Sequence, residues 1–244
     1  MSQQAAGHIQ TPVVSQQLLL SLAEQLKLPL LQIARQAELA SFDGQVNSLA
    51  TIQTTADNAL QLIDSYLLGV RLALEEPYAL QMEPVSVSSV LYDAGHRLEA
   101  MAKSYDVQIE LHIDGKYGPV MAHRQVLEAA LTSLGQALIE SLPALDVPQL
   151  KLQLGAHRCR YGIVTGLYCE AEQLTTEAFR QGKLLSGRSR QPMPSFSHTS
   201  GAGVFVANAL LHAMHSELKI SYHHKLHGLG AILQPNPQMH LVEL

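Results

Sequence analysis

Apolar side chains recur at steps of three and four residues through the first third of the chain. The first stripe comprises Leu19, Leu22, Leu26, Leu30, Ile33 and Ala37. The second has nearly heptad spacing and comprises Leu49, Ile52, Ala56, Leu60, Ile63, Leu67, Val70 and Leu74. This period predicts two amphipathic helices. Residues 41–44 between them read Ser-Phe-Asp-Gly, which favours a turn. We therefore predict a flexible polar tail over residues 1–13 and a long helical hairpin over residues 14–78.

A hairpin of this kind leaves part of each apolar stripe uncovered. Each helix would be about 40 Å long at ~1.5 Å rise per residue, so the uncovered surface is large. Pairing with a second copy would bury both stripes in a four-helix bundle, which predicts a homodimer. Docking of the hairpin onto the rest of its own chain is the alternative that the stripes allow.

The pattern changes after Glu75-Glu76-Pro77, and residues 79–244 mix helical and strand periods. Residues 107–113 alternate apolar and polar side chains, as a half-buried strand does. Further strands are expected at 149–154, 160–166, 217–222 and 228–233, and helices at 85–103, 123–141, near Thr176 and at 203–214. Ser86 or Ser88 is the expected cap of the first of these helices. The predicted fold class is α+β, a helical hairpin followed by an α/β sandwich with one helical layer on one sheet.

Charge and composition exclude several classes of protein. The chain has 16 Lys and Arg against 21 Asp and Glu, a net charge of −5, and no basic block, so nucleic-acid binding is not expected. No apolar run approaches the roughly 20 residues of a membrane span. The first residues lack the features of a signal peptide, which predicts a cytoplasmic protein. Cys159 and Cys169 are too few for a disulfide framework and are expected to be reduced.

Twelve histidines raise the question of a metal site. His223, His224 and His227 lie close together in sequence, and His212 and His215 are three residues apart on a predicted helix. Two imidazoles at that spacing can share one helix face. No cysteine or second cluster accompanies them, so surface and helix-packing roles are favoured and no metal site is predicted.

The first helix carries a motif with an internal proline. Residues 24–30 read Glu-Gln-Leu-Lys-Leu-Pro-Leu, and a proline inside an amphipathic helix is costly enough to be informative. The segment resembles the phosphoacceptor motif of sensor histidine kinases, His-Glu-Leu-Lys/Arg-Thr-Pro-Leu, with matches at Leu26, Lys27, Pro29 and Leu30. That family joins a dimerising hairpin to an ATP-binding domain of the GHKL type. The likeness covers about residues 15–236.

The resemblance breaks at the reactive residue. Glu24 stands where the family has its phosphoacceptor histidine, and no histidine occurs between Thr11 and Gly95. A carboxylate is a poor substitute for the nucleophilic imidazole nitrogen. The resemblance therefore implies a bundle that does not autophosphorylate, with Glu24, Lys27 and Pro29 as candidates for partner binding.

The ATP-binding motifs are altered in the same way. Gln136 lies where the resemblance implies the Asn that helps to bind Mg²⁺ with ATP. The segment Val164 to Glu170 stands for the Asp-x-Gly-x-Gly box but contains no Asp. The later glycine box is better preserved, because Gly201 and Gly203 remain while Phe205 replaces the third glycine. Glycines before a helix let the backbone approach phosphates.

Two functions follow from the resemblance. In the first, the protein is a pseudokinase that uses no cofactor and acts by dimerisation and by binding a response regulator or another kinase subunit. In the second, it is an active ATP-dependent histidine kinase or ATPase with divergent motifs, which uses ATP and Mg²⁺. A dimeric phosphotransferase would also need a histidine in the bundle, and the sequence has none there.

Overall fold

The computed structural model describes residues 26, 29–40, 46–74, 80–141, 149–170 and 201–236. The chain divides into two compact units, Met1–Glu75 and Glu76–Leu244. The predicted flexible tail over residues 1–13 lies outside the described residues, as do the predicted helix near Thr176 and the residues around it.

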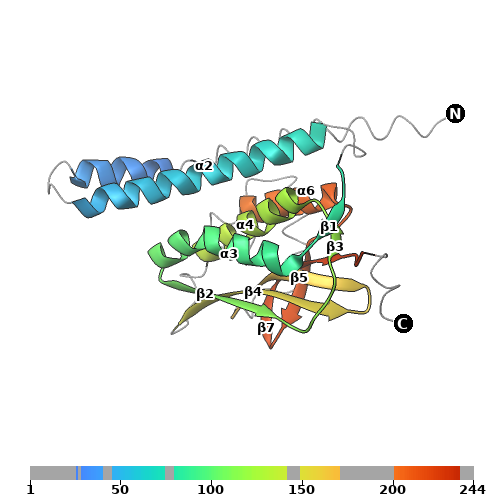
Figure 1. Ribbon diagram of the computed structural model, residues 1–244. Coiled ribbons are helices and arrows are strands. Elements are labelled where there is room, and N and C mark those ends of the chain that lie inside the picture. Colours follow the sequence, from blue (N-terminus) through green and yellow to red (C-terminus); the bar gives the residue numbers. More distant parts are fainter. Residues whose placement is uncertain are drawn as a thin grey trace. The chain divides into compact units, whose positions relative to one another are not determined.

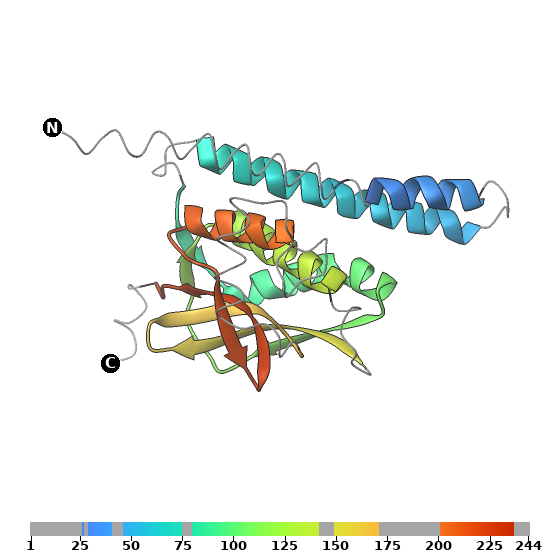
Figure 2. The same ribbon diagram turned by 180° about the vertical axis from the view of Figure 1, so that it is seen from behind.

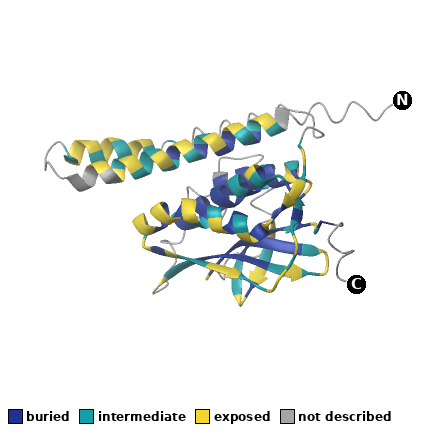
Figure 3. Ribbon diagram, viewed as in Figure 1, coloured by how far each residue is buried: buried dark blue, intermediate teal, exposed yellow. Residues whose placement is uncertain are grey.

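The described residues of the first unit are helical, and they comprise residue 26, residues 29–40 and α2 (Val46–Leu74). One face of α2 is buried, with Ala59, Leu62 and Tyr66 between 1% and 7% exposed. Figure 3 shows exposed and half-buried residues along much of the described part of this unit. In the stripe predicted from the heptad spacing, Leu49 is 64% exposed, Leu60 58% and Leu67 44%. The first half of the predicted hairpin lies largely outside the described residues, so the hairpin as a whole stays a prediction.

The described part of the second unit contains a five-stranded sheet, a two-stranded sheet and three helices. Its elements in chain order are β1 (Glu83–Val85), α3 (Val87–Ser104), β2 (Val107–Ile113), β3 (Val120–Ala122), α4 (Arg124–Ser141), β4 (Leu150–Cys159), β5 (Gly162–Cys169), α6 (Gly201–Ala213), β6 (Lys219–His223) and β7 (Leu226–Leu233). The large sheet has the order β2-β4-β5-β7-β6, with β2 parallel to β4 and the other pairs antiparallel. This mixed arrangement confirms the α/β character predicted for the second half of the chain.

Helices α3, α4 and α6 form one layer on one face of the large sheet (Figures 1 and 2). Along β4, Leu152, Leu154 and Ala156 are fully buried, and Leu154 lies near Gly95 of α3. These alternate residues therefore face the helices. Gly155 and the other odd-numbered residues of β4 face the opposite side, which we call the outer face of the sheet.

Local sequence explains where the elements begin and end. Ser86 caps α3, since its hydroxyl accepts a hydrogen bond from the amide of Ser89 at 3.5 Å, so the first of the two cap candidates is confirmed. The strands expected at 149–154 and 160–166 are longer in the structure and form a hairpin, β4–β5. The short pair β1 and β3 was not predicted. Three residues with a central Pro84 show no alternation to detect.

None of the described helices has both the length and the apolar character that a membrane crossing needs.

Candidate functional site

Helices α4 and α6 pack directly against each other at the position of the glycine motif. A Cβ atom at Gly203 would lie 2.7 Å from the carbonyl oxygen of Ser133 and 3.0 Å from Cβ of Ala137. Gln136 lies beside these residues on α4 and is only 3% exposed. The structure thus brings together two of the predicted nucleotide-site residues, Gln136 and Gly203, and Gly201 begins the same helix α6.

A second glycine holds α4 against the sheet. A Cβ atom at Gly135 would overlap the Leu98 side chain of α3 and would lie 3.2 Å from Leu167 of β5. Because successive residues are about 100° apart around a helix, Gln136 leaves α4 in a different direction from this contact. The tight packing at Gly135 fixes the position of α4, and with it the position of the buried amide.

Strand β5 presents uncharged side chains to the helices. Thr165 and Leu167 share the helix-facing row and are fully buried, and Cys169 at the end of the same row is 2% exposed. Burial raises the pKa of the Cys169 thiol to about 12, so the sulfur stays protonated and is no nucleophile. Strand β5 contains no carboxylate that would accept a hydrogen bond from an adenine amine, and the residue after it, Glu170, is exposed.

Several buried polar atoms make no hydrogen bond within the part of the chain that the structure describes. Those on the elements of the predicted nucleotide site include Oγ1 of Thr132 and Oγ of Ser133 on α4, Oγ1 of Thr165 on β5 and Oδ1 of Asn208 on α6. Helix α4 packs against both of the other elements. Because buried polar groups in proteins nearly always have partners, each of these atoms can bind water or a polar ligand through a neutral hydrogen bond. Sequence reasoning missed these residues, although polar Thr132 and Ser133 inside an apolar helix were a visible signal.

One acidic side chain lies near the end of α4. Glu140 is half-buried, and burial raises the pKa of its carboxyl to about 7. The cause is the loss of hydration, which penalises the charged form. A carboxyl of this kind is partly protonated near neutral pH and is a weak ligand for Mg²⁺.

The predicted partner-binding residues belong to the first unit. Pro29 is helical and half-buried, whereas Glu24 and Lys27 lie outside the described residues.

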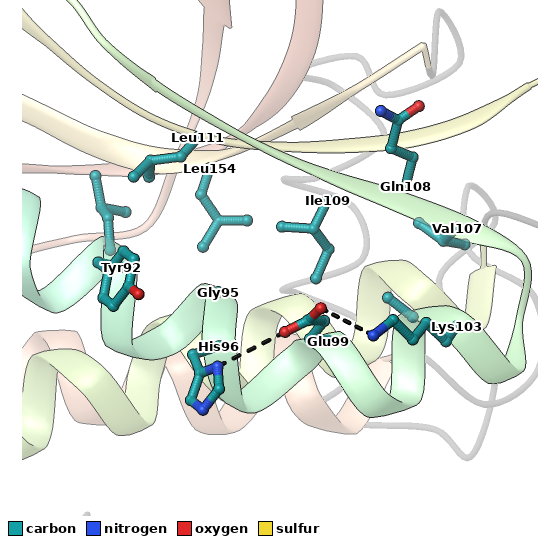
Figure 4. Close-up of a pocket in the computed structure, with 12 residues that line it drawn as sticks. Tyr92, Gly95, His96, Glu99, Lys103, Val107, Gln108, Ile109, Leu111 and Leu154 are labelled. Atoms are coloured by element: carbon teal, nitrogen blue, oxygen red, sulfur yellow. Dashed lines mark hydrogen bonds and ion pairs between the residues drawn. The ribbon is translucent and has the colours of Figure 1, made fainter.

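A separate groove of about 440 Å³ runs between α3 and the edge strand β2 (Figure 4). Its floor is apolar, with Ile109 and Leu154 pointing toward Gly95 of α3. Its rim carries Glu99, which pairs with Lys103 at 2.9 Å and with His96 at 3.6 Å. None of the predicted site residues lines this groove.

No protein-family model matches the chain, and no curated protein matches its sequence. Solved structures do match. The histidine kinase AdeS of Acinetobacter baumannii aligns with a TM-score of 0.52 and 14% identity over 86% of this chain and 96% of that chain. The second unit of the present chain has the fold of a histidine kinase ATPase-like domain. This confirms the resemblance drawn from the sequence motifs.

A second histidine kinase gives the same result. Full-length ShkA, solved in complex with AMPPNP, aligns with a TM-score of 0.52 and 15% identity over 91% of this chain. The alignment covers 46% of ShkA, so the present chain spans about half of that protein. At this identity the likeness establishes the fold of the ATPase-like domain, and the activity has to be argued from the residues at the site.

Proposed function

We propose that this protein is a pseudokinase, a dimeric signalling protein built on the histidine kinase fold that works through binding rather than phosphoryl transfer. Its expected partners are a response regulator or another kinase subunit, and its expected contact surface is the bundle around Glu24, Lys27 and Pro29. The kinase-like fold and the neutral side chains at the site on α4, β5 and α6 support this proposal.

The observation that carries the proposal is that, among the described residues, α4 and β5 contain neither the Asn nor the Asp of the family's nucleotide motifs. Strand β5 offers Thr165 in the helix-facing row and no carboxylate, and α4 offers the buried amide of Gln136. Loss of a polar partner costs about 1–3 kcal/mol of ligand binding in each case. Since 1.4 kcal/mol is about tenfold in affinity, two or three such losses weaken nucleotide binding by at least about 30-fold.

The glycine motif supports the same conclusion. Gly203 is needed for the contact with Ser133 and Ala137, so its presence is explained by helix packing without any phosphate. The third glycine of the family motif is replaced by Phe205. The glycines that remain are therefore no argument for retained ATP binding.

Dimerisation is supported by the exposed leucines of α2. Leu49, Leu60 and Leu67 lie at intervals of eleven and seven residues, which places them on one line along the helix. Full burial of a leucine side chain contributes about 1.5–3 kcal/mol. We call this line of three leucines the seam of α2. Burial of the seam against a second copy of the chain would contribute this free energy for each buried leucine.

The proposal is tested by a phosphorylation assay with γ-labelled ATP and Mg²⁺ on the wild-type protein and on the Glu24→His variant. The substitution restores the histidine of the family motif and leaves the second unit unchanged. The pseudokinase predicts no label on either protein, because the ATPase-like domain does not deliver a phosphoryl group. Labelling of Glu24→His alone would show a working ATPase-like domain, and labelling of the wild type would establish the active kinase instead.

A further inference from the structure

The two edge strands of the large sheet meet on its outer face. His112 is on β2 and His223 is on β6, at opposite ends of the strand order β2-β4-β5-β7-β6. In a flat sheet with about 4.8 Å between neighbouring strands, these positions would be roughly 19 Å apart. Their ring centroids are 5.4 Å apart, so the sheet curls until its edges approach each other.

Glycines on the outer face make room for this approach. Gly155 pairs with His112 on one side and with Gly166 on the other, so this strip of the outer face has no side chains. The space that a Cβ atom at Gly155 would need is taken by the His223 ring, whose Cδ2 would be 3.2 Å away. The end of β6 therefore lies directly on the bare strip, beside β2.

Four metal-ligating side chains converge there. One donor atom from each of His112, Asp114, His223 and His224 lies within 4.8 Å of the other three. The Nε2 atoms of His112 and His224 are 3.0 Å from oxygens of the Asp114 carboxylate, and Nε2 of His223 is 3.7 Å away. In a tetrahedral zinc site with bonds of about 2.0–2.1 Å, neighbouring donors are about 3.3 Å apart. The distances of 3.0 and 3.7 Å to the carboxylate lie on either side of this value, and donors up to 4.8 Å apart would have to approach by about 1.5 Å.

The orientation of the rings fits ligation better than stacking. The three rings are tilted against one another by 64° to 73°, so they spread around a common centre. His223 is held in place by His157, which stacks on it at 4.8 Å with an angle of 11°. The His223 side chain is 3% exposed, and its Nε2 makes no hydrogen bond in the part of the chain described. A buried nitrogen in this position requires a partner.

We propose that His112, Asp114, His223 and His224 form a binding site for one Zn²⁺ ion. Three imidazole nitrogens and one carboxylate oxygen are a ligand set that zinc prefers, and they complete a tetrahedral shell. Sequence reasoning did not assign it because His112 and Asp114 are far from the His223-His224 pair along the chain. The ion would join β2 to the turn after β6 and so fasten the two edges of the curled sheet.

The test uses the full chain without a histidine tag, treated with a chelator and then dialysed. Zinc binding is measured by competition with a chromophoric chelator, and Co²⁺ is added separately because its absorption spectrum reports tetrahedral coordination. We expect one zinc per chain and an intense, tetrahedral Co²⁺ spectrum. Absence of zinc binding, or a Co²⁺ spectrum of purely octahedral type, overturns the proposal.

Substitutions of the proposed ligands test where the zinc ion binds. Asp114→Asn and His224→Ala change exposed side chains, and circular dichroism will be used to check that both variants fold. Each is expected to lose at least about tenfold in zinc affinity, since even outer-shell substitutions cost that much. His96→Ala is the matched control, because His96 is an exposed histidine on α3 outside the cluster. Equal affinity in the wild type, Asp114→Asn and His224→Ala would overturn the assignment.

Discussion

Gly203 of α6 touches the backbone of α4 at Ser133, where a Cβ atom would be only 2.7 Å from the carbonyl oxygen. Packing of the two helices therefore requires a glycine at this position, whether or not a phosphate binds there. For this reason the presence of Gly203 is not evidence of nucleotide binding.

Substitution of Gly203 by alanine should destabilise the second unit. The added methyl group forces α6 away from α4, which costs about 1–3 kcal/mol as other overpacked cores do. Gly95→Ala is the matched control, because the nearest atoms to its Cβ would be at 3.7 and 3.9 Å, an ordinary contact. Gly95→Ala should be neutral or stabilise by up to about 1 kcal/mol through helix propensity. Urea denaturation measures both, and equal effects would contradict the packing argument.

Charge on the exposed seam of α2 should dissociate the dimer. Leu60→Glu and Leu67→Glu place a carboxylate where the second copy is expected, and its desolvation opposes association. Sedimentation velocity at micromolar concentration should show a dimer for the wild type and a monomer for the double variant. Leu111→Glu is the control, since Leu111 on β2 is 45% exposed and Leu67 is 44% exposed. A monomeric wild type, or a dimeric double variant, would refute the seam as the interface.

Glu140 should make the stability of the second unit depend on pH. Its pKa rises from an ordinary 4.5 to about 7 in the folded protein, so the folded state holds the proton more tightly than the unfolded state. The free energy of unfolding should therefore fall as pH increases from about 4.5 to about 7, by up to about 3 kcal/mol, and change no further above that range. Glu140→Gln should flatten this profile, whereas Glu83→Gln on the exposed β1 should not. A profile for Glu140→Gln with the wild-type slope would show that burial of this carboxyl has no such effect.

Zinc should raise the melting temperature through the site on the curled sheet. A ligand that binds only the folded state at 100 times its dissociation constant stabilises by about 2.7 kcal/mol. The wild type and His96→Ala should show this shift in differential scanning fluorimetry, and Asp114→Asn should show little of it. An equal shift in all three proteins would mean that zinc acts elsewhere.

Much of the second unit was predictable because its sequence patterns are local. The alternation over residues 107–113 identified β2, and the apolar period after Arg124 identified α4 with Leu134 and Leu138 facing inward. The fold resemblance rested on the order of these elements and on the short motifs between them. Local patterns do not show which element packs against each face of a helix or strand. The contact of Gly203 on α6 with Ser133 on α4 is an example.

The histidine cluster on the outer face of the sheet could not be predicted from local sequence patterns. His224 and Asp114 are 110 residues apart, and they meet only because the sheet curls over a strip without side chains at Gly155 and Gly166. No spacing rule connects residues over that distance. The histidines after β6 were visible in the sequence, but the residues that complete their cluster depend on the register of five strands.

Calorimetric titration of the full chain with Mg²⁺ and ATP tests the central claim most directly. In the described residues, α4 and β5 carry neither the Asn nor the Asp of the family's nucleotide motifs, so the proposed pseudokinase predicts no heat of binding up to millimolar ATP. Saturable binding of one ATP per chain, weakened when Gln136 is replaced by leucine, would show that the site still takes nucleotide and would contradict the pseudokinase.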